Sequence, residues 1–328
     1  MGEFMNRKRR EIISTNKVSR VVSYSLGGYN QKVLLDGKYE KNPVMLFLHG
    51  GPGIPAPFSV GCRGMYPEFT DHFIMVYWDQ LGCGINNHPI DDNFSIDTFV
   101  DMTIDLVKAL KKEFPDNQLI LFGASWGSVL SAKVAVKLPG LIDNVLVCGQ
   151  VLNNLFFNAE VYETLSKVDL SQKAKKQLME IQDKKEKTIE DIKRIAMLIR
   201  KYTEGYQVKS KDKMKMSGLI YGLLTSPDYS LKDFIAVIKN GFMKNKSILN
   251  ELLRIDLSDI LRNVQVPYHI LQGSLDIVTS TKAVSAFVQN SKNDYLSLRV
   301  LANNGHMPST TGMNEVLKES INLIKIDT

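Results

Sequence analysis

The feature that most constrains the fold is a set of short, continuous apolar runs separated by segments with helical periodicity. Continuous apolar runs are expected where strands are buried on both faces of a parallel sheet. They occur at residues 44–50, 73–79, 118–125 and 142–150. Residues 95–114 carry apolar side chains three and four apart, which is typical of an amphipathic helix. The alternation predicts an α/β fold with a mostly parallel central sheet and helices on both faces.

A long helical segment interrupts the strand pattern. Residues 151–262 show helical periodicity, many lysines and few strand-like runs, and the strand pattern returns at 266–278. The later segments are predicted as helix, strand and helix at residues 281–290, 295–303 and 314–326. We therefore predict a core domain made of residues 18–150 and 263–328, with an all-helical cap domain, residues 151–262, inserted into it.

The chain begins with a basic segment. Residues 1–20 hold six Lys and Arg against two Asp and Glu, without the apolar stretch of a secretory signal. We expect residues 1–17 to be disordered and residues 1–4, ahead of Met5, to be a remnant of cloning. Two alternating runs then predict a β-hairpin, at residues 18–26 and 30–37.

Composition narrows the class of protein. With 44% hydrophobic and 23% charged residues the chain resembles an ordinary globular protein of 328 residues. No apolar run approaches the roughly 20 residues that cross a bilayer, so we expect no membrane partner. Three cysteines, Cys62, Cys83 and Cys148, lack the spacing of metal ligands. They predict free thiols in a reducing compartment, the cytoplasm, and no metal site among the cysteines.

The positive charge is concentrated in the helical insertion. The formal net charge is +6, and residues 151–262 hold 21 Lys and Arg against 15 Asp and Glu. A basic segment can attract nucleic acid. Here, however, lysines alternate with acidic residues at helical spacing, which favours solvated helix faces with i,i+4 pairs. We therefore expect no nucleic-acid partner, and the sequence leaves the oligomeric state open.

The segment Gly123-Ala124-Ser125-Trp126-Gly127 matches G-x-S-x-G between a buried strand and a helix. So sharp a turn strains the serine backbone, and side chains at positions 123 and 127 would collide with it. The turn holds the hydroxyl at a helix N-terminus, where negative charge is stabilised. The motif predicts that Ser125 is a nucleophile; the alternative is a Gly-rich connection in which Ser125 only caps the helix.

A serine nucleophile needs a base and an acid that orients it. The chain has five histidines, His49, His72, His88, His269 and His306. His306 follows the last predicted strand and Asp276 follows the strand before it, at the sheet edge where α/β proteins place active sites. They are predicted as base and acid, against the alternatives of a surface loop histidine and an exposed turn aspartate. Asp256 and Asp259 are weaker candidates because they precede the strand.

The negative charge that develops on the substrate needs two hydrogen-bond donors. We predict the backbone N–H of Trp126, directly after the serine, and that of Gly51 in the loop His49-Gly50-Gly51-Pro52-Gly53. Glycines allow the backbone of this loop to approach the reacting carbon closely. His49 is expected to fix the loop through a hydrogen bond and not to act as the base.

Five motifs together resemble one known family. They are HGGPG at 49–53, WDQLGCG at 78–84, GASWGS at 123–128, GSLDIVT at 273–279 and NNGH at 303–306. This set, in this order, is similar to the proline iminopeptidase family of α/β-hydrolase serine peptidases and covers most of the sheet domain. The resemblance implies a catalytic triad of Ser125, Asp276 and His306, an oxyanion hole of Gly51 and Trp126, and a helical cap. It also implies release of an N-terminal residue, typically proline, from short peptides without a metal or organic cofactor.

The cap departs from the family pattern. Peptidases of this family carry cap glutamates that pair with the free amino group of the substrate, and no segment of residues 151–262 matches them. Glu204, in KYTEGYQV, is the candidate for this role, and an ordinary surface glutamate is the alternative. Because of the family resemblance, the leading prediction is still an aminopeptidase that acts on short peptides. A carboxylesterase or small-amide hydrolase comes second, and a ligand-binding protein without turnover third.

Overall fold

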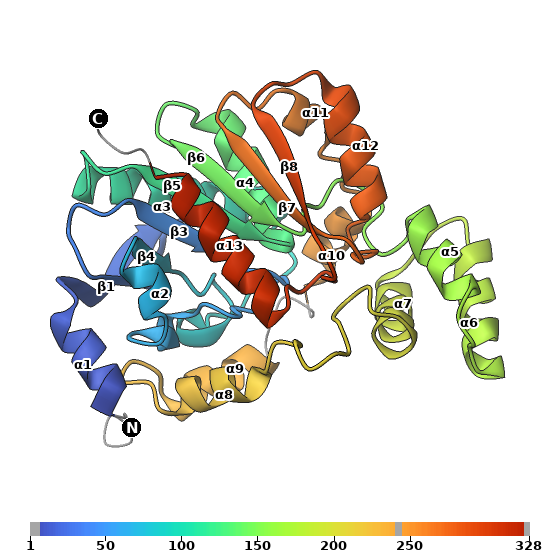
Figure 1. Ribbon diagram of the computed structural model, residues 1–328, viewed down its shortest axis with the longest axis horizontal. Helices are drawn as coiled ribbons and strands as arrows, with labels where there is room; N and C mark the ends of the chain where they lie inside the picture. The colour runs from blue at the N-terminus through green and yellow to red at the C-terminus, as the bar shows by residue number, and fades with distance from the viewer. Residues whose placement is uncertain (1–6, 240–244, 325–328) are drawn as a thin grey trace.

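The computed structural model describes residues 7–239 and 245–324, which form a central sheet with helices on both faces (Figure 1). Its strands are β1 Val18–Leu26, β2 Tyr29–Gly37, β3 Val44–Leu48, β4 Ile74–Tyr77, β5 Leu119–Ala124, β6 Asn144–Cys148, β7 Tyr268–Gly273 and β8 Leu296–Leu301. Their order in the sheet is β1-β2-β4-β3-β5-β6-β7-β8. The β1–β2 and β2–β4 pairs are antiparallel and the others are parallel. The predicted fold class is confirmed.

Helices cover both faces of the sheet, which explains why its central strands are apolar at every position. In β3 alternate side chains enter two different clusters. Leu46 packs in the cluster that includes α3 and α4, whereas Phe47 packs in the cluster that includes α2 and α13. The bounds of these four helices and of α12 are as follows: α2 Pro67–Thr70, α3 Ile96–Glu113, α4 Trp126–Lys137, α12 Thr281–Ser291 and α13 Thr310–Asn322. Two short 3₁₀ turns, η2 Val60–Cys62 and η3 Gly84–Asn86, lie in the loops.

The helices between β6 and β7 do not form one compact cap (Figure 1). They are α5 Ala159–Ser166, α6 Gln172–Asp183, α7 Ile189–Tyr202, α8 Met216–Leu224, α9 Leu231–Lys239, α10 Lys246–Leu253 and α11 Ser258–Arg262. Helices α5 to α7 stand away from the sheet around a separate apolar cluster, which also includes Ile277 and Val278 of the loop after β7. Leu249 of α10 and Leu261 of α11 are instead buried in the main core. The predicted boundary at residue 262 therefore differs from the packing, which joins α10 and α11 to the core.

The N-terminal segment is partly ordered. Helix α1, Arg7–Thr15, lies where disorder was expected over residues 1–17, so that prediction was wrong for the helix. Residues 1–6, with the expected remnant at 1–4, lie outside the described residues, as does the end of the helix predicted at 314–326. Across the two described ranges, every helix falls short of the length or the apolar character that a bilayer crossing requires.

A buried arginine explains why this basic helix is ordered. The Arg9 guanidinium donates to the carbonyl oxygens of Gly61, Arg63 and Gly222, each at 2.7 Å, and Arg9 is only 4% exposed. A guanidinium presents five donors in a rigid fork, so it can satisfy several carbonyls at once. Arg9 thereby joins α1 to the loop after β3 and to α8. A run of four basic residues gives no sign that its third member is buried.

We predict that Arg9→Met lowers the free energy of unfolding by about 3 kcal/mol, because it leaves buried carbonyl oxygens without their donor. Urea denaturation measures this change. Arg10→Met, on the exposed side of the same helix, is the control and should stay within about 0.5 kcal/mol of the wild type. Equal losses in the two variants would contradict the role given to Arg9.

Candidate active site

The turn between β5 and α4 places Ser125 in a strained conformation. Its φ is 50° and its ψ is −113°, a region that residues with a Cβ atom rarely adopt. A Cβ atom at position 127 would overlap the carbonyl oxygen of Leu48, and one at position 123 would overlap the Ser131 hydroxyl. Glycine is therefore required on both sides of the serine. The hydroxyl of Ser125 lies at the N-terminus of α4, as the motif predicts.

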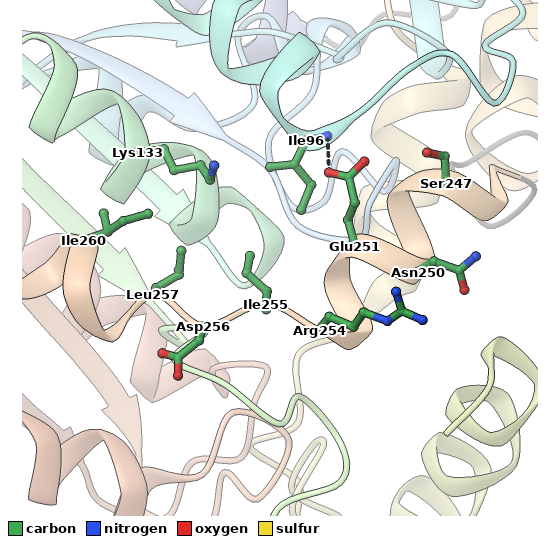
Figure 2. A pocket seen from close by; sticks show the side chains of 10 residues that line it. All are labelled: Ile96, Lys133, Ser247, Asn250, Glu251, Arg254, Ile255, Asp256, Leu257 and Ile260. Atoms are coloured by element: carbon green, nitrogen blue, oxygen red, sulfur yellow. Dashed lines mark hydrogen bonds between the residues drawn. The ribbon is translucent and has the colours of Figure 1, made fainter. Parts of the chain in front are cut away.

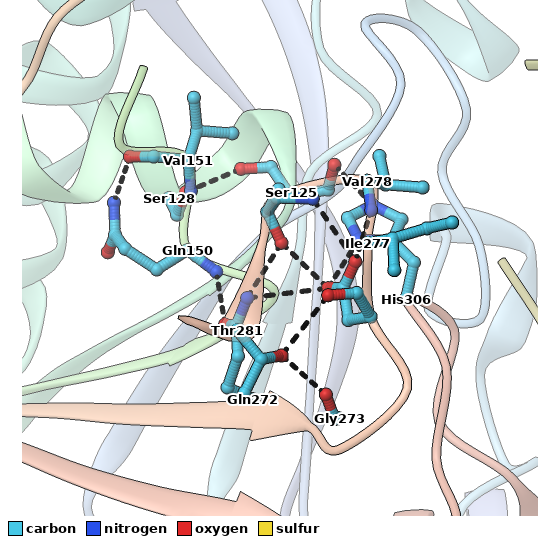
Figure 3. Close-up of polar contacts among 12 residues, drawn as sticks. Ser125, Ser128, Gln150, Val151, Gln272, Gly273, Ile277, Val278, Thr281 and His306 are labelled. Atoms are coloured by element: carbon cyan, nitrogen blue, oxygen red, sulfur yellow. Dashed lines mark hydrogen bonds and ion pairs between the residues drawn. The ribbon is translucent and has the colours of Figure 1, made fainter. Parts of the chain in front are cut away.

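The structure brings the three predicted catalytic residues into one chain of hydrogen bonds. The Oγ atom of Ser125 lies 2.8 Å from Nε2 of His306. The Nδ1 atom of the same imidazole lies 2.9 Å from Oδ2 of Asp276. Figure 3 shows Ser125 and His306 meeting at the ends of the strands. Ser125 and His306 are 181 residues apart in sequence, and the ends of β5, β7 and β8 bring the three groups to the same edge.

The Asp276 carboxylate is fully buried and surrounded by donors. Its Oδ1 accepts from the N–H groups of Val278 (2.8 Å) and Thr279 (3.1 Å). Its Oδ2 accepts from the Thr279 hydroxyl (2.7 Å) in addition to the imidazole, and Nε2 of Gln272 lies 3.4 Å away. These donors offset the cost of burying the charge. They also fix the direction in which Oδ2 faces His306.

A buried polar network joins the acid to the serine turn (Figure 3). Oε1 of Gln272 accepts from the backbone N–H of Gln150 at 3.0 Å, next to the end of β6. The neighbouring N–H, of Val151, donates to the Ser128 hydroxyl, which in turn donates to the carbonyl oxygen of Ser125 at 2.6 Å. Our sequence analysis missed this network. Its only signal was one glutamine in each of two predicted strand segments, Gln150 and Gln272.

The glycine-rich loop after β3 lies against the serine turn. A Cβ atom at Gly50 would come within 3.3 Å of the Ala124 carbonyl oxygen and 3.6 Å of the Ser125 Cβ. Gly51 has a φ of 122°, which favours glycine. Trp126 opens α4 directly after the serine. The two residues predicted to donate to an oxyanion, Gly51 and Trp126, therefore both belong to segments that border Ser125.

His49 fixes this loop from inside the protein. Its Nδ1 donates to the Gly50 carbonyl oxygen at 2.9 Å, and its Nε2 accepts from the Gln80 N–H at 3.0 Å. The Gln80 side chain also accepts from the indole N–H of Trp126 at 2.8 Å. Burial lowers the pKa of His49 to about 4, because the imidazolium loses its hydration. His49 is thus a buried neutral link between two loops, which agrees with its expected structural role.

The other predicted candidates lie outside this chain of hydrogen bonds. The Glu204 carboxylate is exposed and accepts from the backbone N–H of Lys209 at 2.7 Å, within its own turn. Asp256 accepts from the N–H of Ser258, and Asp259 pairs with Arg262 at 2.7 Å. The remaining histidines lie in other surroundings. His269 bonds to Ser297, and His72 and His88 are exposed.

Asp256 lines a hollow whose lining does not include the triad. Figure 2 shows this hollow. It has a volume of about 490 Å³, and Lys133 of α4 and Glu251 of α10 face it from opposite sides. Its lining is Ile96, Lys133, Ser247, Asn250, Glu251, Arg254, Ile255, Asp256, Leu257 and Ile260, without Ser125, Asp276 or His306. In the described ranges, no cluster of three His, Cys, Asp or Glu side chains is suited to hold a metal.

Comparison with known proteins identifies the family. Residues 43–312 match the alpha/beta hydrolase fold family, and the chain belongs to that family. The matched span contains the strands from β3 to β8 together with Ser125, Asp276 and His306. Membership of the α/β-hydrolase fold family, which the five motifs indicated, is therefore confirmed.

Relatives extend over most of the chain at low identity. A protein named probable aminopeptidase YbaC, of Bacillus subtilis, is 24% identical over 87% of this chain and 89% of its own length. A putative proline iminopeptidase of Mycoplasma genitalium is 24% identical over 81% and 85%. Among solved structures, VinJ has a TM-score of 0.66 at 18% identity, covering 93% of this chain and 97% of its own. The proline iminopeptidase of Mycobacterium smegmatis has a TM-score of 0.61 at 16% identity, covering 92% and 97%.

The burial of neutral His49 predicts an effect of pH on stability. Its pKa falls from the usual 6.5 to about 4 on folding, so the unfolded chain binds the extra proton between these pH values. The contribution of His49 to the free energy of unfolding should therefore be fully present above pH 6.5. About 3 kcal/mol of it should be lost as the pH falls to 4.

Urea denaturation at several pH values tests this prediction through variants. His49→Gln, which cannot titrate, should show a smaller loss on acidification than the wild type. His72→Gln, at an exposed histidine, is the matched control and should behave as the wild type. Parallel pH profiles for the wild type and His49→Gln would contradict the prediction.

Proposed function

We propose that this protein is a serine hydrolase that acts through an acyl-enzyme. The observation that carries the proposal is the unbroken chain from the Ser125 hydroxyl through the His306 imidazole to the buried Asp276 carboxylate, at 2.8 and 2.9 Å. Serine hydrolases of several folds use this arrangement, because a serine hydroxyl is a weak nucleophile without a base. Ser125 is partly exposed, whereas the side chain of His306 is only 8% exposed.

In the proposed reaction, Nε2 of His306 accepts the proton of Ser125 Oγ as that oxygen attacks the carbonyl carbon of the substrate. The resulting oxyanion is held by the backbone N–H groups of Gly51 and Trp126. Asp276 accepts from Nδ1 and stabilises the imidazolium. His306 then gives its proton to the leaving amine or alcohol, which departs and leaves the acyl group on Ser125. Water, activated by His306, hydrolyses this ester and restores the serine.

The leading substrate class is short peptides with a free N-terminal residue, with proline preferred. Support comes from the two relatives named as an aminopeptidase and a putative proline iminopeptidase, each aligned over more than 80% of this chain. Glu204 is proposed to bind the free amino group. A carboxylesterase or small-amide hydrolase is the second candidate. It is favoured by the exposed position of the Glu204 carboxylate and its bond to the Lys209 N–H.

We propose the cytoplasm as the location of the protein. The thiols of Cys62, Cys83 and Cys148 are free and buried. Burial raises the pKa of Cys62 to about 11 and that of Cys148 to about 12, so these thiols stay protonated and unreactive near neutral pH. Unpaired cysteines support a reducing compartment.

A fluorophosphonate probe should label the wild-type protein at Ser125, because such probes react with activated serines. Labelling should disappear in Ser125→Ala and slow by about 10³-fold or more in His306→Gln, which lacks the base. Ser166→Ala, at an exposed serine, is the control and should label normally. Gel fluorescence measures the rate. A wild-type protein that resists the probe would favour a binding protein without turnover.

The substrate class can be tested with a proline arylamide and a short-chain aryl ester. We expect turnover of the arylamide, and a KM that rises about tenfold or more in Glu204→Gln through loss of an ion pair of at least about 1.4 kcal/mol. Glu186→Gln, at another exposed glutamate of the insertion, should leave the KM unchanged. Ester turnover without arylamide turnover, unaffected by Glu204→Gln, would establish the esterase instead.

A further inference from the structure

A segment of the helical insertion is bonded to the loop that carries His306. We call residues 203–207, which follow α7, the strap. The carbonyl oxygen of Gly205 accepts from the backbone N–H of His306 at 3.0 Å. The next carbonyl oxygen, of Tyr206, accepts from the N–H of Met307 at 2.8 Å. Two consecutive peptide groups of the insertion thus hold the backbone at the imidazole-bearing residue.

The two backbones are too close for side chains between them. A Cβ atom at Gly305 would lie 2.5 Å from the Glu204 carbonyl oxygen and 2.9 Å from the Tyr206 carbonyl carbon. A Cβ atom at Gly205 would overlap Cγ1 of Ile277, the residue after Asp276. The strap therefore touches the loops of both the acid and the base. Contacts this close transmit a shift of one segment to the other.

The strap is fixed at the end of α7. The buried hydroxyl of Thr203 donates to the Ile199 carbonyl oxygen at 2.8 Å and accepts from the Gly205 N–H at 3.0 Å. This one side chain sets the turn that aims the Gly205 carbonyl at His306. Tyr206 continues the contact, because the centre of its ring lies 6.0 Å from that of the imidazole.

From these contacts we infer that the strap positions the catalytic base, with Thr203 and Gly205 as its positioning residues. The inference rests on the hydrolase function proposed above. The sheet supplies the strands after which Asp276 and His306 lie, and the insertion supplies the backbone acceptors that place the imidazole between Asp276 and Ser125. A misplacement of about 1 Å in such a site can cost about 10² in rate, so small changes in the strap should reduce kcat.

The first experiment compares two substitutions of Thr203, with the aryl ester as substrate. Thr203→Val removes the hydroxyl and should lower kcat by about tenfold or more. Thr203→Ser keeps the hydroxyl and should restore kcat to within about threefold of the wild type. The hydrogen-bonded Nδ1 proton of His306, observed without substrate as a far-downfield resonance in the proton NMR spectrum, should weaken in Thr203→Val and persist in Thr203→Ser.

The second experiment is a double-mutant cycle at the contact between the strap and the acid loop. Gly205→Ala should lower kcat by about 10²-fold, and Ile277→Ala should recover part of that loss in the double variant by removing the overlapping atoms. Gly218→Ala is the control in the same insertion. A Cβ atom there meets no other atom within 4 Å, and kcat should be unchanged.

Two results would overturn the inference. One is a Thr203→Val protein that unfolds at lower urea concentration yet keeps the wild-type kcat and the downfield resonance, which would make the strap merely structural. The other is additivity in the double-mutant cycle. Failure of the proposed function is seen separately, because wild-type protein would then resist the fluorophosphonate probe while the resonance still reports the position of His306.

Discussion

The site depends on a negative charge that is buried without contact with solvent. The Asp276 carboxylate is 0% exposed, and an isolated charge in that position would destabilise the fold. Its donors come from its own loop and from β7, and His306 completes them. Because each donor is held by backbone or by a buried side chain, the carboxylate has one orientation. That orientation aligns the imidazole with Ser125.

The rigid surroundings of this charge extend across three strands. Gln272 at the end of β7 bonds to the peptide beyond β6, and the next peptide bonds through Ser128 to the turn after β5. Neighbouring parallel strands end at the same edge, so short side chains are sufficient to connect them. The serine and the acid are therefore positioned relative to one another by the sheet. The base is different, since its backbone is bonded to the insertion.

Much of the sheet and the triad could be predicted, because their signals are local. Continuous apolar runs mark strands that are buried on both faces, and the glycines beside Ser125 mark a turn that tolerates no Cβ atom. His306 and Asp276 were found by their place after two predicted strands. The burial of Arg9 gave no such signal, because its partners are carbonyl groups as far as 213 residues away. The packing of α10 and α11 into the core was hidden for the same reason: amphipathic helices look alike wherever their apolar face is buried.

The strap left no trace in the sequence beyond the glycines at 205 and 305. The strap is joined to the loop of His306 by two backbone hydrogen bonds, between segments about 100 residues apart. Backbone atoms are the same in every residue, so these bonds leave no pattern in the sequence. Our interpretation of KYTEGYQV therefore singled out Glu204 for its charge, whereas the structure uses the main chain beside it.

This pairing has a consequence for the exchange of segments between related hydrolases. A chimera that took residues 151–262 from one parent and the remainder from another would combine the strap of one protein with the histidine loop of the other. Crossover points that take residues 203–207 and the loop of His306 from the same parent would preserve the contact, whereas a single crossover between these two segments would divide it. The modular appearance of the insertion in a ribbon drawing thus overstates its independence.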